Sequence, residues 1–259
     1  MLLRVLFVGD IVGNPGRKAL DDGIASLKED FDLIVINAEN AAGGFGLTES
    51  VARELFKSGA AVLTSGNHIW DKKEALDLLE SDPRIIRPLN YAPGVPGKGS
   101  TIVTTPGGYK VGVMNLSGRV FMNPMDCPFR TSAAAVEQMR KETSVIIMDF
   151  HAEATSEKIA MGYHLDGKVS AVLGTHTHVQ TADERILEGG TAYITDVGMT
   201  GPVDGVIGVD RQQILDRFLL GMPNRYEVAK GRNVFNAVML EIDSKTGRAE
   251  SIKRIYKLI

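Results

Sequence analysis

Five histidines stand out in this 259-residue chain, and two of them lie in one pentapeptide. Gly174-Thr175-His176-Thr177-His178 follows the apolar run 169–173, which is typical of a short buried strand that the glycine ends. A strand would point His176 and His178 to opposite faces, whereas a tight loop can aim both imidazoles at neighbouring points. Neutral imidazole is a common metal ligand. The pentapeptide alone fits two metal ions that take one histidine each, and it fits two surface or hydrogen-bonded histidines equally well.

Two further histidines follow the same local pattern. His68 comes after the apolar run 60–65 and Gly66-Asn67, and His151 ends the apolar run 145–150. The carboxyl ends of buried strands meet at the edge where open α/β sheets place their sites. Independent structural histidines would not repeat this placement, so the pattern favours a metal site. The fifth histidine, His164, is interpreted as structural.

Oxygen-bearing side chains occupy the other strand ends. Asp10 follows the first apolar run, Glu39 and Asn40 follow the second, and Asn67 precedes His68. Each of them alone has an ordinary explanation as a turn, capping or exposed residue. Together with the histidines they form a mixed oxygen and nitrogen set that suits Mn, Fe, Zn or similar ions. A buried Glu39 would also be costly unless it were paired or bound to a metal.

Strands and helices alternate in the first part of the chain. This β-α-β-α-β-α order predicts a mainly parallel sheet with right-handed crossovers. Residues 13–16 are expected to form a turn, and Thr48 is expected to cap a helix. The other expected elements are strands 2–8, 33–36 and 61–64, and helices 17–28 and 72–80.

The second part contains two predicted hairpins, 101–104 with 110–116 and 237–242 with 252–258. Residues 121–130 hold two prolines and are expected to form a loop over the site, and residues 198–202 a loop at its rim. The other expected elements are helices 132–141, 156–161 and 211–220, and strands 144–150, 169–173 and 191–195. We therefore expect one domain, 1–259, with a mixed sheet core, for which two packed sheets with helices outside are one arrangement.

The overall composition excludes some classes of protein. The 29 Lys and Arg nearly balance the 32 Asp and Glu, so the net charge of −3 offers no electrostatic basis for non-specific nucleic-acid binding. The single cysteine, Cys127, cannot form an internal disulfide, which fits a reducing compartment, and is interpreted as a buried filler. The apolar segment 1–10 is too short to span a bilayer and lacks a basic leader. We expect a cytoplasmic protein with no membrane partner.

The motifs resemble the ordered blocks of the calcineurin-like metallophosphoesterases. The resemblance rests on Gly9-Asp10, Gly66-Asn67-His68, His151 and the pentapeptide 174–178. Two blocks depart from the usual pattern, because Asp10 lacks the usual histidine two residues later and Asn37-Ala38-Glu39-Asn40 replaces Gly-Asp-x-x-Asp/Asn. These departures, with residues 66–71 and 115–122, resemble the bacterial YmdB-like branch from Leu3 to near the carboxyl terminus.

The resemblance implies a four-layer α/β/β/α sandwich with mixed sheets and two metal ions. Its implied ligands are Asp10, Glu39, Asn40, Asn67, His151, His176 and His178. Glu39 would bridge the ions, with Asp10, Asn40 and His178 on one of them. Asn67, His151 and His176 would complete the other. We favour iron or manganese over zinc.

The resemblance also implies hydrolysis of 2′,3′- or 3′,5′-cyclic nucleotides by a hydroxide that bridges the metals. His68 is expected to protonate the leaving group or to donate to a phosphoryl oxygen. Asp71 either orients His68 or is only an acidic residue at a helix start. Arg119 and Ser117 are candidate substrate contacts, and a surface salt bridge is the alternative for Arg119.

Three alternatives remain at this point. The same site suits a phosphomonoesterase or an RNA-processing nuclease, and a metal-stabilised regulatory protein with little turnover is a different class. The resemblance also implies RNA-related partners. The apolar segment 255–259 permits, but does not require, a homo-oligomer.

Overall fold

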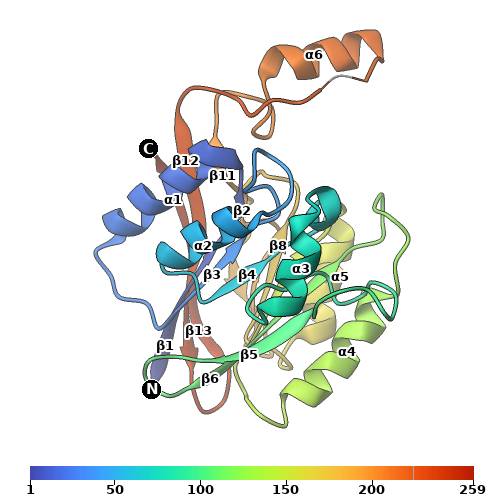
Figure 1. Ribbon diagram of the computed structural model, residues 1–259. Coiled ribbons are helices and arrows are strands. Elements are labelled where there is room, and N and C mark those ends of the chain that lie inside the picture. The colour runs from blue at the N-terminus through green and yellow to red at the C-terminus, as the bar shows by residue number, and fades with distance from the viewer. Residues whose placement is uncertain (224) are drawn as a thin grey trace.

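Two mixed β-sheets pack face to face in the computed structural model, which describes residues 1–223 and 225–259 (Figure 1). In the seven-stranded sheet, β1, β3 and β4 are parallel, and β1, β12 and β13 are antiparallel. In the six-stranded sheet, β6, β7, β8 and β10 are parallel. The first sheet consists of β1 (Leu2–Val8), β2 (Asp10–Ile11), β3 (Leu33–Asn37), β4 (Val62–Thr64), β11 (Met199–Pro202), β12 (Asn233–Asp243) and β13 (Ala249–Leu258). The second consists of β5 (Ser100–Thr104), β6 (Lys110–Ser117), β7 (Ile146–His151), β8 (Ala171–Thr175), β9 (Arg185–Ile186) and β10 (Ala192–Ile194).

The position of strand β1 between two cores explains why its sequence is apolar without interruption. Leu3, Val5 and Phe7 belong to the core between the two sheets, whereas Leu6 and Val8 belong to the core under the helices. Successive side chains of a strand point to opposite faces, so both faces of β1 are buried.

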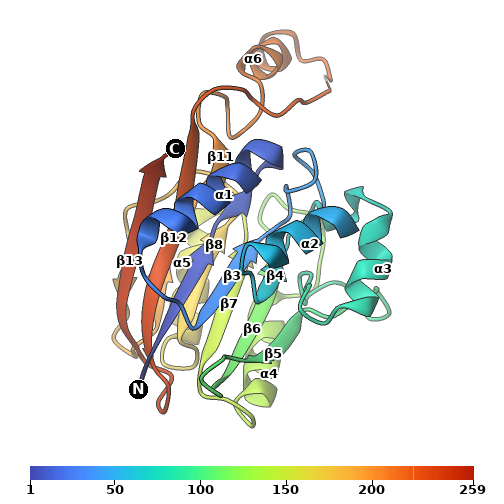
Figure 2. The same cartoon turned by 60° about the vertical axis from the view of Figure 1, so that its left-hand side comes forward.

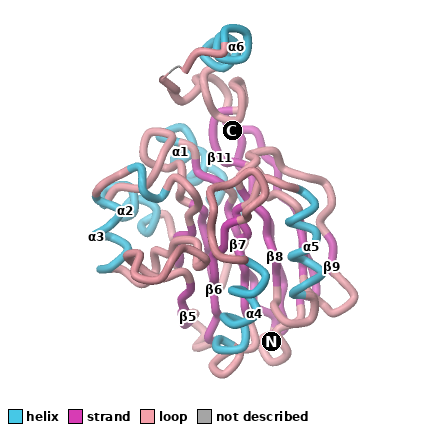
Figure 3. Tube along the Cα trace, turned by 90° about the vertical axis from the view of Figure 1, so that its right-hand side faces the viewer, coloured by secondary structure: helices cyan, strands magenta, loops and turns pink. Residues whose placement is uncertain are grey.

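Helices cover the outer face of each sheet. Helices α1 (Gly13–Leu27), α2 (Glu49–Lys57) and α3 (Glu74–Ser81) pack on the first sheet (Figure 2). Helices α4 (Pro128–Met139) and α5 (Thr155–Leu165) pack on the second (Figure 3). The expected four-layer α/β/β/α sandwich is therefore confirmed. Helix α6 (Arg211–Leu220) projects beyond these layers at one end of the molecule (Figure 1).

Several expected boundaries are wrong for identifiable reasons. Residues 13–16 form the first turn of α1, where the missing N–H of Pro15 costs no helical hydrogen bond. For the same reason Pro128 begins α4 inside the expected loop 121–130. Residues 199–202 are not a loop but strand β11, which pairs with β2 and β12. Strand β8 does not end at Gly174, as expected, but continues to Thr175. The interpretation of Cys127 as a buried filler is also wrong, because this residue is only half-buried.

Both predicted hairpins are confirmed, as β5 with β6 and β12 with β13. That residues 1–259 form a single domain stays a prediction. Among the described residues, no helix has the length and apolar character that a membrane crossing requires.

Candidate metal centre and active site

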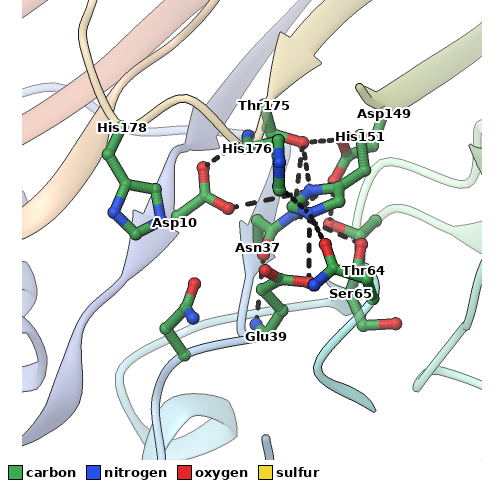
Figure 4. Close-up of polar contacts among 12 residues, drawn as sticks. Asp10, Asn37, Glu39, Thr64, Ser65, Asp149, His151, Thr175, His176 and His178 are labelled. Atoms are coloured by element: carbon green, nitrogen blue, oxygen red, sulfur yellow. Dashed lines mark hydrogen bonds and ion pairs between the residues drawn. The ribbon is translucent and has the colours of Figure 1, made fainter. Parts of the chain in front are cut away.

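The core between the sheets becomes polar at the carboxyl ends of four neighbouring strands. Along β3, β4, β7 and β8 the residues that face this core are apolar, and the last one or two are polar. Because side chains alternate, a residue two positions beyond a core residue points in the same direction. These polar residues are Asn37, Thr64, Asp149 and Thr175, and all four are buried. They form the floor of the candidate site (Figure 4).

Asp149 is the centre of this floor. Its carboxylate accepts hydrogen bonds from Asn37 Nδ2 at 2.9 Å, from Thr175 Oγ1 at 2.7 Å and from Thr64 Oγ1. Burial raises the pKa of Asp149 to about 7, although His151 and the two threonine hydroxyls act in the opposite direction. Its three donors fix the carboxylate in one orientation.

The Asp149–Thr175 contact determines how His151 is oriented. The Thr175 hydroxyl donates its single proton to Asp149. Toward His151 Nδ1, 2.9 Å away, the hydroxyl oxygen can therefore only accept, so Nδ1 carries the proton of that hydrogen bond. The other ring nitrogen, Nε2, then points at Glu39 Oε2, which lies 3.1 Å away. Metal-binding histidines commonly hold their second ring N–H in this way, because the bond sets the tautomer and the ring direction.

Replacing Thr175 with valine tests this orientation. Valine keeps the shape of threonine but accepts no hydrogen bond, so we expect the affinity for metal to fall about 10- to 100-fold. Calorimetric titration of metal into the chelator-stripped protein measures the change. Thr175→Ser keeps the hydroxyl and is expected to bind metal within about threefold of the original protein. Equal affinities for the valine and serine variants would contradict this role.

Three ligand atoms converge on one point. Glu39, His151 and His176 each offer one such atom, and these atoms lie within 4.8 Å of one another. His176 Nδ1 is 3.0 Å from His151 Nε2, and Asn67 Oδ1 is 3.1 Å from the same nitrogen. This cluster is the candidate metal site that the residues present fit most directly.

The electrostatics of the cluster favour a cation at this point. Burial lowers the pKa of His151, but the carboxylates of Glu39, Asp10 and Asp149 outweigh it and raise the value to about 9. Burial and the neighbouring His151 lower the pKa of His176 to about 3. Neutral imidazole is the form that binds metals, and carboxylates around His151 attract positive charge.

A second group of ligand atoms lies beside the first. His178 and Asp10 are neighbours in Figure 4, and His178 Nδ1 donates to the carbonyl oxygen of Ile207 at 2.8 Å, which leaves Nε2 free. Asp10 Oδ1 and Asn40 Oδ1 are buried and have no hydrogen-bond partner within the described part of the chain. They are two of five such oxygens in the described part of the chain, and Asn40 lines the same cavity as Glu39 and His176, where a cation would satisfy it.

The loop that carries His176 and His178 is tight, as the sequence predicted. Both residues have positive φ angles, 99° and 66°, which side chains with a Cβ rarely adopt. Between them, Thr177 donates from its backbone N at 3.1 Å and from its hydroxyl at 2.7 Å to Asp196 Oδ2. Lys158 Nζ donates to the same oxygen at 2.6 Å, and both side chains are buried. The buried ion pair therefore holds the strained loop in place.

Removing the Lys158 charge tests that support. In Lys158→Met the Asp196 carboxylate is left buried without its cation, so we expect a loss of about 3–5 kcal/mol of stability. At about 2–4 °C per kcal/mol, the melting temperature falls by roughly 6–20 °C. Thermal unfolding followed by circular dichroism measures it. The exposed Lys168→Met serves as the control, and a fall of about 2 °C or less in Lys158→Met would contradict the role.

Gly66 and His68 lie on the other side of the cluster. A Cβ atom on Gly66 would come within 2.0 Å of Glu39 Oε2 and 2.3 Å of His151 Nε2, so only glycine fits there. His68 Nδ1 lies 2.8 Å from Asp71 Oδ2, the contact that the orienting role considered for Asp71 requires. The His68 ring packs edge to face on Phe45, with 5.0 Å between ring centroids.

A cavity of about 590 Å³ opens above these residues. Glu39, Asn40, His68, His176 and His178 line its inner side. Its opposite wall comes from residues 206–209, from α6 and from residues 226–228. This volume is typical of a site for a small molecule.

The two substrate contacts proposed from sequence lie elsewhere. Ser117 is buried in β6, and its hydroxyl donates to the carbonyl oxygen of Gly118 at 3.3 Å. Arg119 is exposed, and its backbone N donates to the buried Glu157 carboxylate. Neither residue is among those that line the cavity. Their role in substrate binding stays a prediction.

Sequence reasoning missed the residues that support the ligands. Asp149 lies in an apolar run two residues before His151. A charged residue in a buried strand needs a partner, and this was the signal in the sequence that could have identified Asp149 as part of the site. Nothing local marked Thr175 or Asp196 as supports, because their partners are distant in sequence. The wall formed by α6 was missed for the same reason.

A family model described as "YmdB-like protein" matches residues 6–255. The chain belongs to the YmdB-like family. This confirms the resemblance that the histidine and asparagine motifs carry.

Curated relatives and solved structures agree with this assignment. The chain is 49% identical over 255 residues to a Bacillus subtilis protein named 2′,3′-cyclic-nucleotide 2′-phosphodiesterase, a match that covers 98% of this chain and 96% of that one. It is 38% identical to a putative phosphatase/phosphodiesterase of Mycoplasma genitalium, over 98% and 92% of the two chains. A hypothetical protein from Thermus thermophilus superposes with a TM-score of 0.93 at 41% identity, over 99% of both chains. A novel phosphatase from Mycoplasma pneumoniae gives 0.92 at 34%, over 100% of this chain and 94% of the other.

Proposed function

We propose that this YmdB-like protein is a metal-dependent phosphodiesterase that hydrolyses 2′,3′- or 3′,5′-cyclic nucleotides. The observation that carries the proposal is the cluster of Glu39, His151 and His176, which is open to a cavity. Beside it lie buried oxygens of Asp10 and Asn40 that have no hydrogen-bond partner among the described residues. The name of the Bacillus relative supports the same reaction class and a cyclic nucleotide as the substrate.

The ligand atoms suit two metal ions. Glu39, with Asn67, His151 and His176, would hold one, and Glu39, with Asp10, Asn40 and His178, the other. When bound, such ions neutralise charge on phosphoryl oxygens and lower the pKa of a bound water. The set combines carboxylate and amide oxygens with imidazole, donors that suit manganese, iron and zinc, and of these we favour iron or manganese.

The chain's own residues complete the chemistry. His68 lines the cavity with Glu39 and is held through Nδ1 by Asp71, so Nε2 is the nitrogen left to meet the substrate. From there it donates a proton to the leaving ribose oxygen or a hydrogen bond to a phosphoryl oxygen. Glu39 is additionally fixed by the backbone N–H of His68, which donates to Oε2 at 3.4 Å.

Chelation tests the proposal. Metal per chain is measured by mass spectrometry, and hydrolysis of a 2′,3′-cyclic nucleotide is followed before and after chelation. We expect about two metal ions per chain, loss of hydrolysis on chelation, and recovery with manganese or iron above that with zinc. Protein that binds no metal under any of these conditions would overturn the proposal.

A comparison of a cyclic diester with a phosphomonoester as substrates separates the alternative functions. The Mycoplasma relatives carry the word phosphatase in their names, so a phosphomonoester is the direct comparison. Turnover of the cyclic diester and not of the monoester supports the phosphodiesterase. The reverse preference would support a phosphomonoesterase, and metal without turnover would support a regulatory binding protein.

A further inference from the structure

Part of the cavity wall is aromatic. Phe45, from the loop after β3, and Tyr226, from the segment after α6, stack with 6.5 Å between ring centroids and 28° between planes. Both residues line the cavity, and Phe45 also touches the ring of His68. A continuous aromatic surface therefore leads from His68 toward α6.

Helix α6 extends this surface. Phe218 lines the cavity although its side chain is 81% exposed, and the Arg217 guanidinium lies over the Tyr226 ring, 5.2 Å from its centroid. The Asp210 side chain caps the first turn of α6, and the Tyr226 segment is tied to the helix by Glu227 N, which donates to Gln213 Oε1 at 2.8 Å. The helix and the Tyr226 segment thus form one wall.

The reaction proposed above assigns no role to this wall. The metal ligands and His68 account for the phosphate and the leaving oxygen, whereas the cavity of about 590 Å³ is far larger than a phosphate group. Planar rings with accessible faces are the surface on which nucleic-acid bases stack, and every base has such a face.

We propose that Phe45, Tyr226 and Phe218 form the nucleobase subsite of this enzyme. The inference rests on the proposed phosphodiesterase function and deepens it, because it assigns the part of the cavity that separates nucleotides from other cyclic phosphodiesters. Stacking is tolerant of base identity, so the subsite accepts purines and pyrimidines.

Paired substrates test the subsite. Adenosine 2′,3′-cyclic phosphate carries a base, and glycerol 1,2-cyclic phosphate has the same five-membered phosphodiester without one. In Tyr226→Ala we expect kcat/KM on the nucleotide to fall about tenfold, with the glycerol ester changed by less than about twofold. Tyr226→Phe keeps the ring and is expected to restore the nucleotide rate.

Helix α6 offers a matched control. Phe218 and Leu219 are 81% and 80% exposed, but only Phe218 of the two lines the cavity. Phe218→Ala is expected to weaken the nucleotide reaction alone, and Leu219→Ala to change neither reaction. Equal losses on both substrates, no loss in any aromatic variant, or the same loss in Leu219→Ala would overturn the subsite.

Binding measurements separate this inference from the proposed function. If the original protein hydrolyses neither of these esters nor a 3′,5′-cyclic nucleotide, the proposed function fails. Calorimetric binding of adenosine 2′-phosphate and inorganic phosphate then still tests the subsite. Weaker binding of the nucleotide in Tyr226→Ala, with phosphate binding unchanged, supports it. Equal binding of the nucleotide by the original protein and the variant overturns it.

Discussion

Replacing Glu39 with glutamine is expected to remove bound metal and to lower kcat/KM on a 2′,3′-cyclic nucleotide by about 10³-fold or more. Glu39 supplies the only carboxylate of the three-residue cluster, and its Oε2 faces His151 Nε2 at 3.1 Å. Glutamine keeps the size of the side chain but removes the charge that would hold a cation between these atoms. A metal ion contributes several kcal/mol to the transition state, and each ~1.36 kcal/mol is a factor of ten in rate.

The measurement combines metal content, thermal unfolding and steady-state kinetics on the same preparation. Glu142→Gln makes the same chemical change at an exposed residue that pairs with Lys110 Nζ at 3.0 Å, so it is expected to keep full metal and activity. Burial alone would raise the pKa of Glu39, but the charge and hydrogen bond of His151 lower it to about 2. The carboxylate is thus ionised near neutral pH, and its loss is a loss of charge. Full metal content together with unchanged kcat/KM in Glu39→Gln would contradict the assignment.

Local signals in the sequence were enough for the elements and for the ligand types. Strand β1 was predicted with its observed bounds, because an uninterrupted apolar run fits a strand that is buried on both faces. Helix α6 was predicted at 211–220 and has those bounds, with the Asp210 side chain at its start and Gly221 in the left-handed conformation at its end. The expectation that strand ends converge placed Glu39, His151 and His176 together.

Contacts between distant segments could not be predicted in this way. Asp149 supports His151 only through Thr175 on the next strand, and Asp196 supports the 176–178 loop from beyond β10. Arg119 was proposed as a substrate contact from its neighbours in sequence. Those neighbours do not show that the residue is exposed and that it is not among the residues lining the cavity. The sequence of α6 indicates a helix, but the position of that helix over the cavity depends on residues 226–228 and on Phe45.

Replacing His68 with alanine is expected to leave bound metal unchanged and to lower kcat on a 2′,3′-cyclic nucleotide by about 10²–10⁴-fold. The substitution keeps the backbone N–H that donates to Glu39 Oε2, so the carboxylate retains this support. It removes only the imidazole that Asp71 orients beside the cavity. His164→Ala is the control, because His164 Nε2 contacts the carbonyl oxygen of Phe129 at 3.0 Å, where α5 meets α4 on the outer face of the second sheet. Loss of metal from His68→Ala would show that His68 is a ligand.

The leaving group distinguishes the two roles of His68. A ribose oxygen is a poor leaving group that benefits from protonation, whereas a nitrophenolate leaves readily without a proton. If His68 is the general acid, His68→Ala loses about 10²-fold or more on the cyclic nucleotide but less than about tenfold on bis(p-nitrophenyl) phosphate. If His68 instead donates to a phosphoryl oxygen, both substrates lose rate to a similar extent, because both develop charge on that oxygen. Asp71→Asn is expected to give a smaller loss with the same substrate pattern, since it leaves the imidazole in place but removes the carboxylate that orients it. A variant that turns over both substrates at the original rate would exclude His68 from the reaction.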